Sequence, residues 1–115
     1  MKNKRVEPIK FGRFNIQGWS CLSSNAWQRR IRKNNSSAND YAGNAGYIEC
    51  CYNEYSNCWA LIISNDTLVD CYKQMYLVDK TSIVYTIKRD FKTFEAAKDH
   101  LNEFFDKFNK LKAFL

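Results

Sequence analysis

The sequence predicts an α+β fold: a four- to five-stranded antiparallel sheet, a long amphipathic C-terminal helix packed on one face, and a short basic N-terminal helix. Residues 47–88 contain aromatic and β-branched runs separated by short turns, which is typical of strands. Residues 93–112 carry phenylalanines at helical spacing, and residues 24–33 combine a serine cap with several bases. We therefore expect one domain over residues 1–115.

The composition predicts a folded domain without a transmembrane helix. The chain has 115 residues, of which 45% are hydrophobic and 16% aromatic, which is enough for one core. The longest apolar run, residues 58–63, is far shorter than the roughly 20 residues that a membrane helix needs. No apolar stretch follows the basic N-terminus, so no secretory signal is predicted. The expected location is the cytoplasm.

The N-terminal third is expected to contain a strand and a helix. Residues 1–10 are predicted to be frayed. In residues 11–19 apolar and polar residues alternate imperfectly, which predicts a strand. Ser23 or Ser24 then suits the cap of a short helix that ends at Lys33. In that helix Trp27 and Ile31, four positions apart, share one face.

Residues 34–46 are predicted to form a mobile loop. They are almost all small or polar, so they cannot bury enough apolar area to offset the entropy lost on ordering. Loops of this length inside a compact domain usually serve binding or join two parts.

The sheet is predicted over residues 47–88. Asn65 and Asp66 are assigned to a turn within it. The strands are expected at residues 47–52, 58–63, 68–72, 75–78 and 82–87, with the third and fourth either separate or one bulged strand.

The helix over residues 93–112 is the most regular pattern in the chain. Thr93 suits its N-cap, and Glu95 in the first turn suits the positive end of the helix dipole. We expect its apolar stripe to pack on the sheet: Phe94, Ala97, Leu101, Phe104, Phe105 and Phe108.

Positive charge is concentrated in the N-terminal third. The formal net charge is +6, yet residues 1–33 hold nine bases and one acid, while residues 34–115 hold nine bases and eleven acids. Such a segment is either a solvated face or a contact surface for nucleic acid or an acidic protein. The candidate contact residues are Arg29, Arg30, Arg32 and Lys33, with Arg13 and Trp19 as a further base and a stacking aromatic.

No catalytic or metal-binding motif is recognised. The five cysteines (21, 50, 51, 58 and 71) lack zinc-site spacing and are expected to be reduced, buried thiols. His100 has no nucleophile motif beside it, and Asp79 and Asp90 are predicted to lie too far apart to share a metal. We therefore predict no enzymatic activity, no cofactor and no metal.

The ending of the chain resembles a known class of small proteins. Residues 82–98 combine a strand with the phrase F-x-T-x-x-x-A-K, carried by Phe91, Thr93, Ala97 and Lys98. This ending is similar to that of small phage and mobile-element proteins with a sheet and a C-terminal helix, such as anti-CRISPR proteins. The resemblance implies an inhibitor, and a basic one would not imitate DNA as acidic inhibitors do.

The resulting functional hypothesis is a non-enzymatic binding protein. It would be a phage-type inhibitor or accessory factor that docks on an acidic protein surface or a nucleoprotein through the basic N-terminal segment. The alternative is direct nucleic-acid binding by the same basic and aromatic residues.

Overall fold

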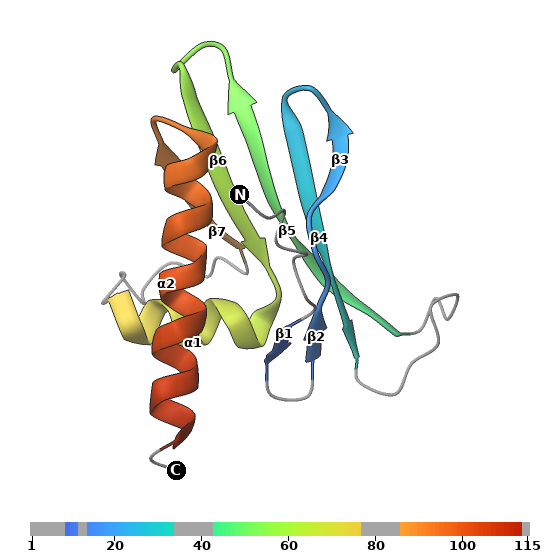
Figure 1. Ribbon diagram of the computed structural model, residues 1–115, viewed down its shortest axis with the longest axis vertical. Coiled ribbons are helices and arrows are strands. Elements are labelled where there is room, and N and C mark those ends of the chain that lie inside the picture. The colour runs from blue at the N-terminus through green and yellow to red at the C-terminus, as the bar shows by residue number, and fades with distance from the viewer. Residues whose placement is uncertain (1–8, 12–13, 34–42, 77–85, 114–115) are drawn as a thin grey trace, which may run out of the picture.

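The computed structural model describes residues 9–11, 14–33, 43–76 and 86–113. Within these ranges the chain forms seven strands and two helices (Figure 1). The first strands are β1 (Ile9–Phe11), β2 (Phe14–Ile16), β3 (Ser20–Ser23) and β4 (Ala26–Lys33). They are followed by β5 (Asn44–Asn53), β6 (Cys58–Ser64), α1 (Asp66–Tyr76), β7 (Thr86–Phe91) and α2 (Phe94–Ala113).

All strand pairs are antiparallel, and six strands follow one another in the order β1-β2-β4-β5-β6-β7. The seventh strand, β3, pairs with β4 on the side that β2 occupies further along. The backbone N–H of Gln17 donates to the carbonyl of Arg30, 2.9 Å away, in the interval between β2 and β3. β2 and β3 therefore act as one interrupted strand along β4.

The core lies between one face of the sheet and the two helices. Strand register places Ile48, Ile63 and Ile87 side by side on this face, and all three are buried. The helices complete the core with Leu68, Val69 and Tyr72 from α1 and with Ala97, Leu101, Phe104 and Phe105 from α2. No described residue of the opposite sheet face belongs to this core. In the described part of the chain the fold is thus a two-layer α+β sandwich with both helices on one face of the sheet, and we call the other face the open face.

The predicted N-terminal helix is wrong, because residues 26–33 form strand β4. A spacing of four places Trp27 and Ile31 on one face of a helix, but it also places them on one face of a strand, since four is a multiple of two. Arg29 lies between them and is also buried, which fits a strand and not a helix. Because Arg29 is charged but points inward, the alternation of buried and exposed positions typical of a strand is not visible in the sequence.

Residues 66–76 also differ from the prediction, because they form helix α1 where strands were expected. The buried positions Leu68, Val69 and Tyr72 follow helical spacing. Asn65 is a helix cap: its side-chain oxygen accepts from the N–H of Leu68 at 3.0 Å, and its Nδ2 donates to the Ala45 carbonyl at 2.9 Å. The turn assigned to this asparagine is therefore the start of a helix.

The remaining predictions are confirmed in part. The antiparallel sheet, strands β5 and β6 and the C-terminal helix are present, and the Thr93 hydroxyl accepts from the N–H of Ala96 at 3.0 Å as a cap should. The described sheet has more strands than the four or five expected. Residues 44–46, assigned to a loop, belong to β5, and residues 9 and 10 belong to β1. Residues 1–8, 34–42 and 77–85, which include Asp79, lie outside the described residues.

Gly46 is a position where only glycine suits the backbone. Its φ of 128° lies in the left-handed region, and an added Cβ would collide with the carbonyl oxygen of Ser64 on the neighbouring strand. Gly46→Ala is therefore expected to lower the free energy of unfolding by about 2 kcal/mol, measured by urea denaturation. Asn57→Gly is the control. Asn57 has φ 54° in the β5–β6 turn, a conformation that glycine adopts freely, so the free energy of unfolding of this variant should change by less than about 0.5 kcal/mol. A free energy of unfolding that Gly46→Ala leaves unchanged would contradict this explanation.

Candidate binding surface on the sheet

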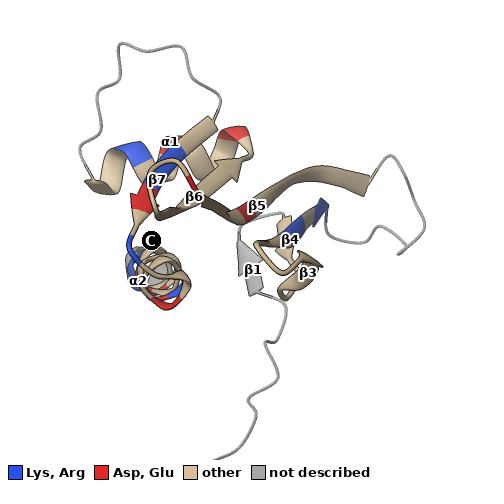
Figure 2. Cartoon of the chain, turned by 90° about the horizontal axis from the view of Figure 1, so that it is seen from above, with Lys and Arg blue, Asp and Glu red and all other residues tan. Residues whose placement is uncertain are grey.

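The alternation of β4 divides the four predicted contact bases between two faces of the sheet. Arg29 points toward the helices and is 1% exposed, whereas Arg30 is exposed on the open face. Arg32 shares the face of Arg30 but is 8% exposed, and Lys33 is exposed at the end of the strand. The four bases therefore do not form one continuous patch. Figure 2 marks in blue where the described Lys and Arg residues lie along β4.

Arg29 is a structural residue of the core. Its Nε donates to the carbonyl of Gln17 at 2.6 Å, and its guanidinium lies 5.7 Å from the Trp19 ring centroid and 5.5 Å from that of Phe105. No carboxylate forms an ion pair with it among the described residues, and its Nη2 has no hydrogen-bond partner. Burial lowers the pKa of Arg29 to about 10. Cation–π contact with the two rings thus partly replaces hydration.

Trp19, the predicted stacking aromatic, is also part of the packing. Its ring meets Phe94 edge to face at 5.6 Å, and Phe94 is stacked further on Trp27 at 5.6 Å and Trp59 at 5.2 Å. All three tryptophans of the chain therefore surround the first residue of α2. Trp19 does not line the pocket that contains Arg30, and Arg13 lies outside the described residues.

The open face carries a basic pocket between β4 and β5, which we call the β4–β5 pocket. Its volume is 360 Å³, and it is lined by Gln28, Arg30, Arg32, Asn44, Gly46 and Tyr47. Arg30 is the direct cross-strand partner of Tyr47, and Arg32 is the partner of Asn44. Tyr47 is one of three large apolar or aromatic side chains that are exposed in the described part of the chain.

A β-bulge shapes this pocket. Ile31 pairs with Gly46 and the next residue, Arg32, pairs with Asn44, so Ala45 is an extra residue on β5. The bulge returns Asn44 to the face that carries Arg30 and Tyr47. The sequence alone predicts residue 44 in a loop and Tyr47 at the start of a strand. Only the pairing of β4 with β5, which joins residues distant in the chain, reveals the pocket.

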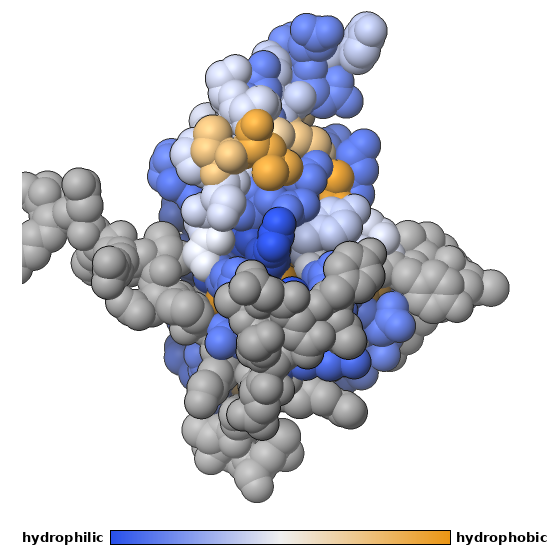
Figure 3. All heavy atoms as spheres, turned by 90° about the vertical axis from the view of Figure 1, so that its right-hand side faces the viewer, coloured by the Kyte–Doolittle hydropathy of each residue, from blue (hydrophilic) through white to orange (hydrophobic). Residues whose placement is uncertain are grey.

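Seen from the side of β3 and β4, the described surface is largely hydrophilic with a small apolar patch (Figure 3). Strand β3 is exposed throughout, and its Leu22 is 54% exposed. A small apolar patch of this kind is normal on a protein surface. The polar and charged groups therefore distinguish this side of the protein.

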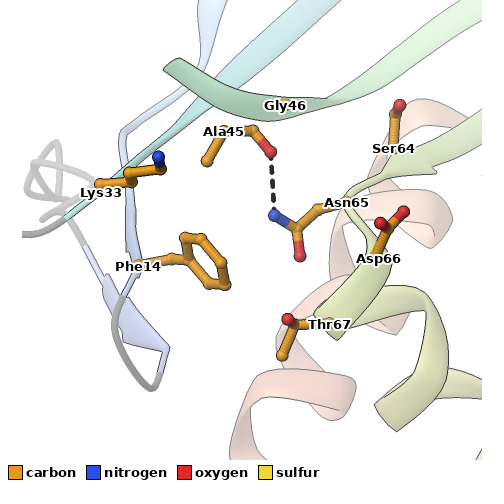
Figure 4. A pocket seen from close by; sticks show the side chains of 8 residues that line it. All are labelled: Phe14, Lys33, Ala45, Gly46, Ser64, Asn65, Asp66 and Thr67. Atoms are coloured by element: carbon orange, nitrogen blue, oxygen red, sulfur yellow. Dashed lines mark hydrogen bonds between the residues drawn. The ribbon is translucent and has the colours of Figure 1, made fainter. Parts of the chain in front are cut away.

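A second pocket of 410 Å³ lies beside the start of α1 (Figure 4). Lys33 and Phe14 line one side, and Asp66 and Thr67 line the other. The acid and the base on opposite walls offset each other's charge, so this pocket has no single electrostatic preference. We assign no ligand to it.

A polar cluster connects α1, β7 and α2. The Tyr72 hydroxyl lies 2.6 Å from Nε2 of His100 and accepts from Nη1 of Arg89 at 3.1 Å. With Arg89 donating, the phenol proton is available to Nε2 of a neutral His100, whose Nδ1 lies 3.6 Å from Glu103. Burial, and then the charge of Arg89, lower the pKa of His100. Tyr72 is 1% exposed, so its hydroxyl links α1 to β7 and α2 within the core.

Glu103 and Tyr76 complete this cluster at the surface. The Tyr76 hydroxyl donates to Glu103 at 2.9 Å, and this bond, followed by the charge of Lys107, lowers the pKa of Glu103. Burial and the same bond raise the pKa of Tyr76. Both groups therefore keep their ordinary charge states near neutral pH.

The cysteines are free thiols, of which Cys50 alone is buried and Cys21 is exposed, so their predicted burial is wrong for most of them. Burial raises the pKa of Cys50 to about 12, which keeps this thiol protonated and unreactive at neutral pH. In the part of the chain that the structure describes, no group of three histidine, cysteine or acidic side chains could hold a metal ion. No helix there is long and apolar enough to cross a membrane.

Comparison of the chain with models of protein families, with curated proteins and with solved structures finds no match.

Substitutions at Arg29 test its structural role. Arg29→Ala is expected to lower the free energy of unfolding by about 3 kcal/mol, because it leaves a cavity between Trp19 and Phe105. Arg29→Met keeps most of the volume and removes the buried charge, so its stability should lie within about 1 kcal/mol of the wild type or above it. Arg30→Met is the exposed control and should change stability by less than about 0.5 kcal/mol. If Arg29→Met destabilises as much as Arg29→Ala, the guanidinium itself is required.

Acidification is expected to weaken the fold through His100. Its pKa in the folded chain lies below the ordinary 6.5, so the unfolded chain binds the proton first as the pH falls. The stability contributed by neutral His100 is present above pH 6.5 and is lost as the pH falls from there through the folded-state pKa. Urea denaturation between about pH 7.5 and about pH 5 measures this loss. His100→Gln should flatten the profile in this window, and an equally steep profile in that variant would contradict the assignment.

Proposed function

We propose that this chain is a non-enzymatic binding protein that docks on an acidic protein surface or a nucleoprotein through its basic N-terminal segment. The observation that supports this most is the β4–β5 pocket, which presents Arg30 and Arg32 on the sheet face that the helices leave open. Guanidinium groups recognise carboxylates and phosphates through paired hydrogen bonds. An anionic partner therefore fits this surface.

The charge on the open face favours a confined contact. Glu49 pairs across the strands with Gln28, and Asp90 lies on the same face of β7. Glu49 thus lies between the basic pair Arg30 and Arg32 and the separate base Lys88 on β7. A partner with a defined anionic group fits such a surface better than a long uniform polyanion.

The order of elements agrees with the inhibitor part of this proposal. Strand β7 runs into α2 through the Thr93 cap, which is the strand-then-helix ending that resembles small phage proteins such as anti-CRISPR proteins. A basic inhibitor or accessory factor acting in the cytoplasm of a host cell would engage an acidic component of its target. It would not act as a DNA mimic.

Direct nucleic-acid binding is the second candidate. It is favoured by Tyr47, which is 38% exposed and is the cross-strand partner of Arg30. An exposed aromatic ring beside a cation is the arrangement on which an unpaired base stacks.

Charge reversal of the exposed bases tests the proposal without disturbing the core. Arg30→Glu with Lys33→Glu is expected to reduce partner recovery from a lysate of the native host at least about tenfold, because both bases would then repel an anionic partner. The matched control, Lys88→Glu with Lys92→Glu, makes the same change in net charge at exposed positions of β7 and the residue after it, and should leave recovery unchanged.

Nuclease treatment of the lysate separates the two candidates. Recovery that survives nuclease supports a protein partner, and recovery that is lost supports nucleic acid. Equal recovery by both double variants and the wild type, with unchanged circular dichroism, would refute docking through this segment.

A further inference from the structure

The β4–β5 pocket brings an aromatic ring and two guanidiniums together on adjacent cross-strand pairs. Arg30 faces Tyr47, and Arg32 faces Asn44 one pair further along the same face. Directly paired side chains have Cβ atoms about 5 Å apart, so these four groups border one site. The exposure of Tyr47 and Arg30 leaves the site open to solvent.

The lining of the pocket favours a phosphate group. Its six described lining residues include two guanidiniums and two carboxamides, which donate hydrogen bonds, and none of these six carries a carboxylate. Arg32 lines the pocket at 8% exposed, while Arg30 is exposed at the surface. Gly46 lines the pocket with its backbone. The volume of 360 Å³ lies within the usual range for small-ligand sites, about 300–1,000 Å³.

Tyr47 adds a second requirement to the ligand. Its exposed ring offers a flat apolar face beside the basic groups. In a duplex the faces of the bases are stacked on one another, so only an unpaired base can lie on such a ring. Glu49, the next residue on this face of β5, does not line the pocket, and its charge opposes a second phosphate there.

We propose that the β4–β5 pocket binds single-stranded nucleic acid, with one backbone phosphate held by Arg30 and Arg32 and the adjacent base stacked on Tyr47. This inference rests on the proposed function of the basic segment and selects nucleic acid as the part of the partner that the open face touches. An acidic protein segment could use the two arginines but would gain nothing from the ring of Tyr47.

Fluorescence anisotropy with a short labelled oligothymidylate tests this site on the full chain. The wild type is expected to bind at about 50 mM salt and to weaken steeply toward about 200 mM. Tyr47→Leu should weaken binding about tenfold by removing the stacking surface, whereas Tyr47→Phe should retain binding within about twofold. Arg30→Gln should weaken binding and lower the slope of affinity against salt by about 0.7.

Two matched variants control for changes away from the pocket. Tyr55→Leu removes a tyrosine that is 94% exposed in the β5–β6 turn, and Lys88→Gln removes an exposed base on the same sheet face. Both should bind the oligonucleotide like the wild type. A duplex of the same sequence with its complement should bind more weakly than the single strand, because its bases cannot reach the ring.

Several results would overturn the inference while leaving docking through the basic segment intact. These are no oligonucleotide binding at about 50 mM salt, binding that Tyr47→Leu leaves unchanged, or equal losses in Tyr47→Leu and Tyr55→Leu. Binding of a polyglutamate peptide that depends on Arg30 but not on Tyr47 would instead identify an acidic protein as the partner. Failure of the charge-reversal experiment is a separate result, since it concerns recovery of the natural partner.

Discussion

The alternation of side chains along β4 is the constraint on which most of this structure depends. β4 is hydrogen-bonded to β2 and β3 on one side and to β5 on the other, so its register is set from both sides. That register directs Arg29 and Ile31 to the core and Arg30 and Arg32 to the open face. A shift by one residue would place Arg30 beneath α2 and expose Ile31. One face of β4 therefore contributes to the core and the other face to the candidate binding site, and the register of this single strand fixes both.

The sequence correctly predicts those elements whose residue pattern fits only a helix or only a strand. Helix α2 has an apolar stripe too long and regular for a strand, and β5 and β6 are rich in aromatic and β-branched residues. In β4 and α1 the spacing of four is shared by helix and strand, as with Leu68 and Tyr72. In these two segments the choice between helix and strand depends on the burial of Arg29 in β4 and on the hydrogen bond from Asn65 to Ala45 before α1. Both features arise from tertiary structure.

The candidate site is less predictable than the fold, for a related reason. The sequence predicts Arg30 and Arg32 as contact residues, because a concentration of charge can be seen within a single segment. Tyr47 and Asn44 join them only through strand pairing and a bulge, which a local pattern does not reveal. Conversely, Arg29 was assigned to the surface by its charge although its two aromatic neighbours hold it in the core. Net charge along the sequence therefore overstates what the folded surface presents.

The placement of the tryptophans has a spectroscopic consequence. Trp19, Trp27 and Trp59 all contact Phe94 at the first turn of α2, and none of them lines the β4–β5 pocket. Intrinsic indole emission therefore reports whether the C-terminal helix is seated on the sheet, with little contribution from occupancy of the open face. The chain carries its own optical probe of folding, separate from the surface at which a partner would arrive.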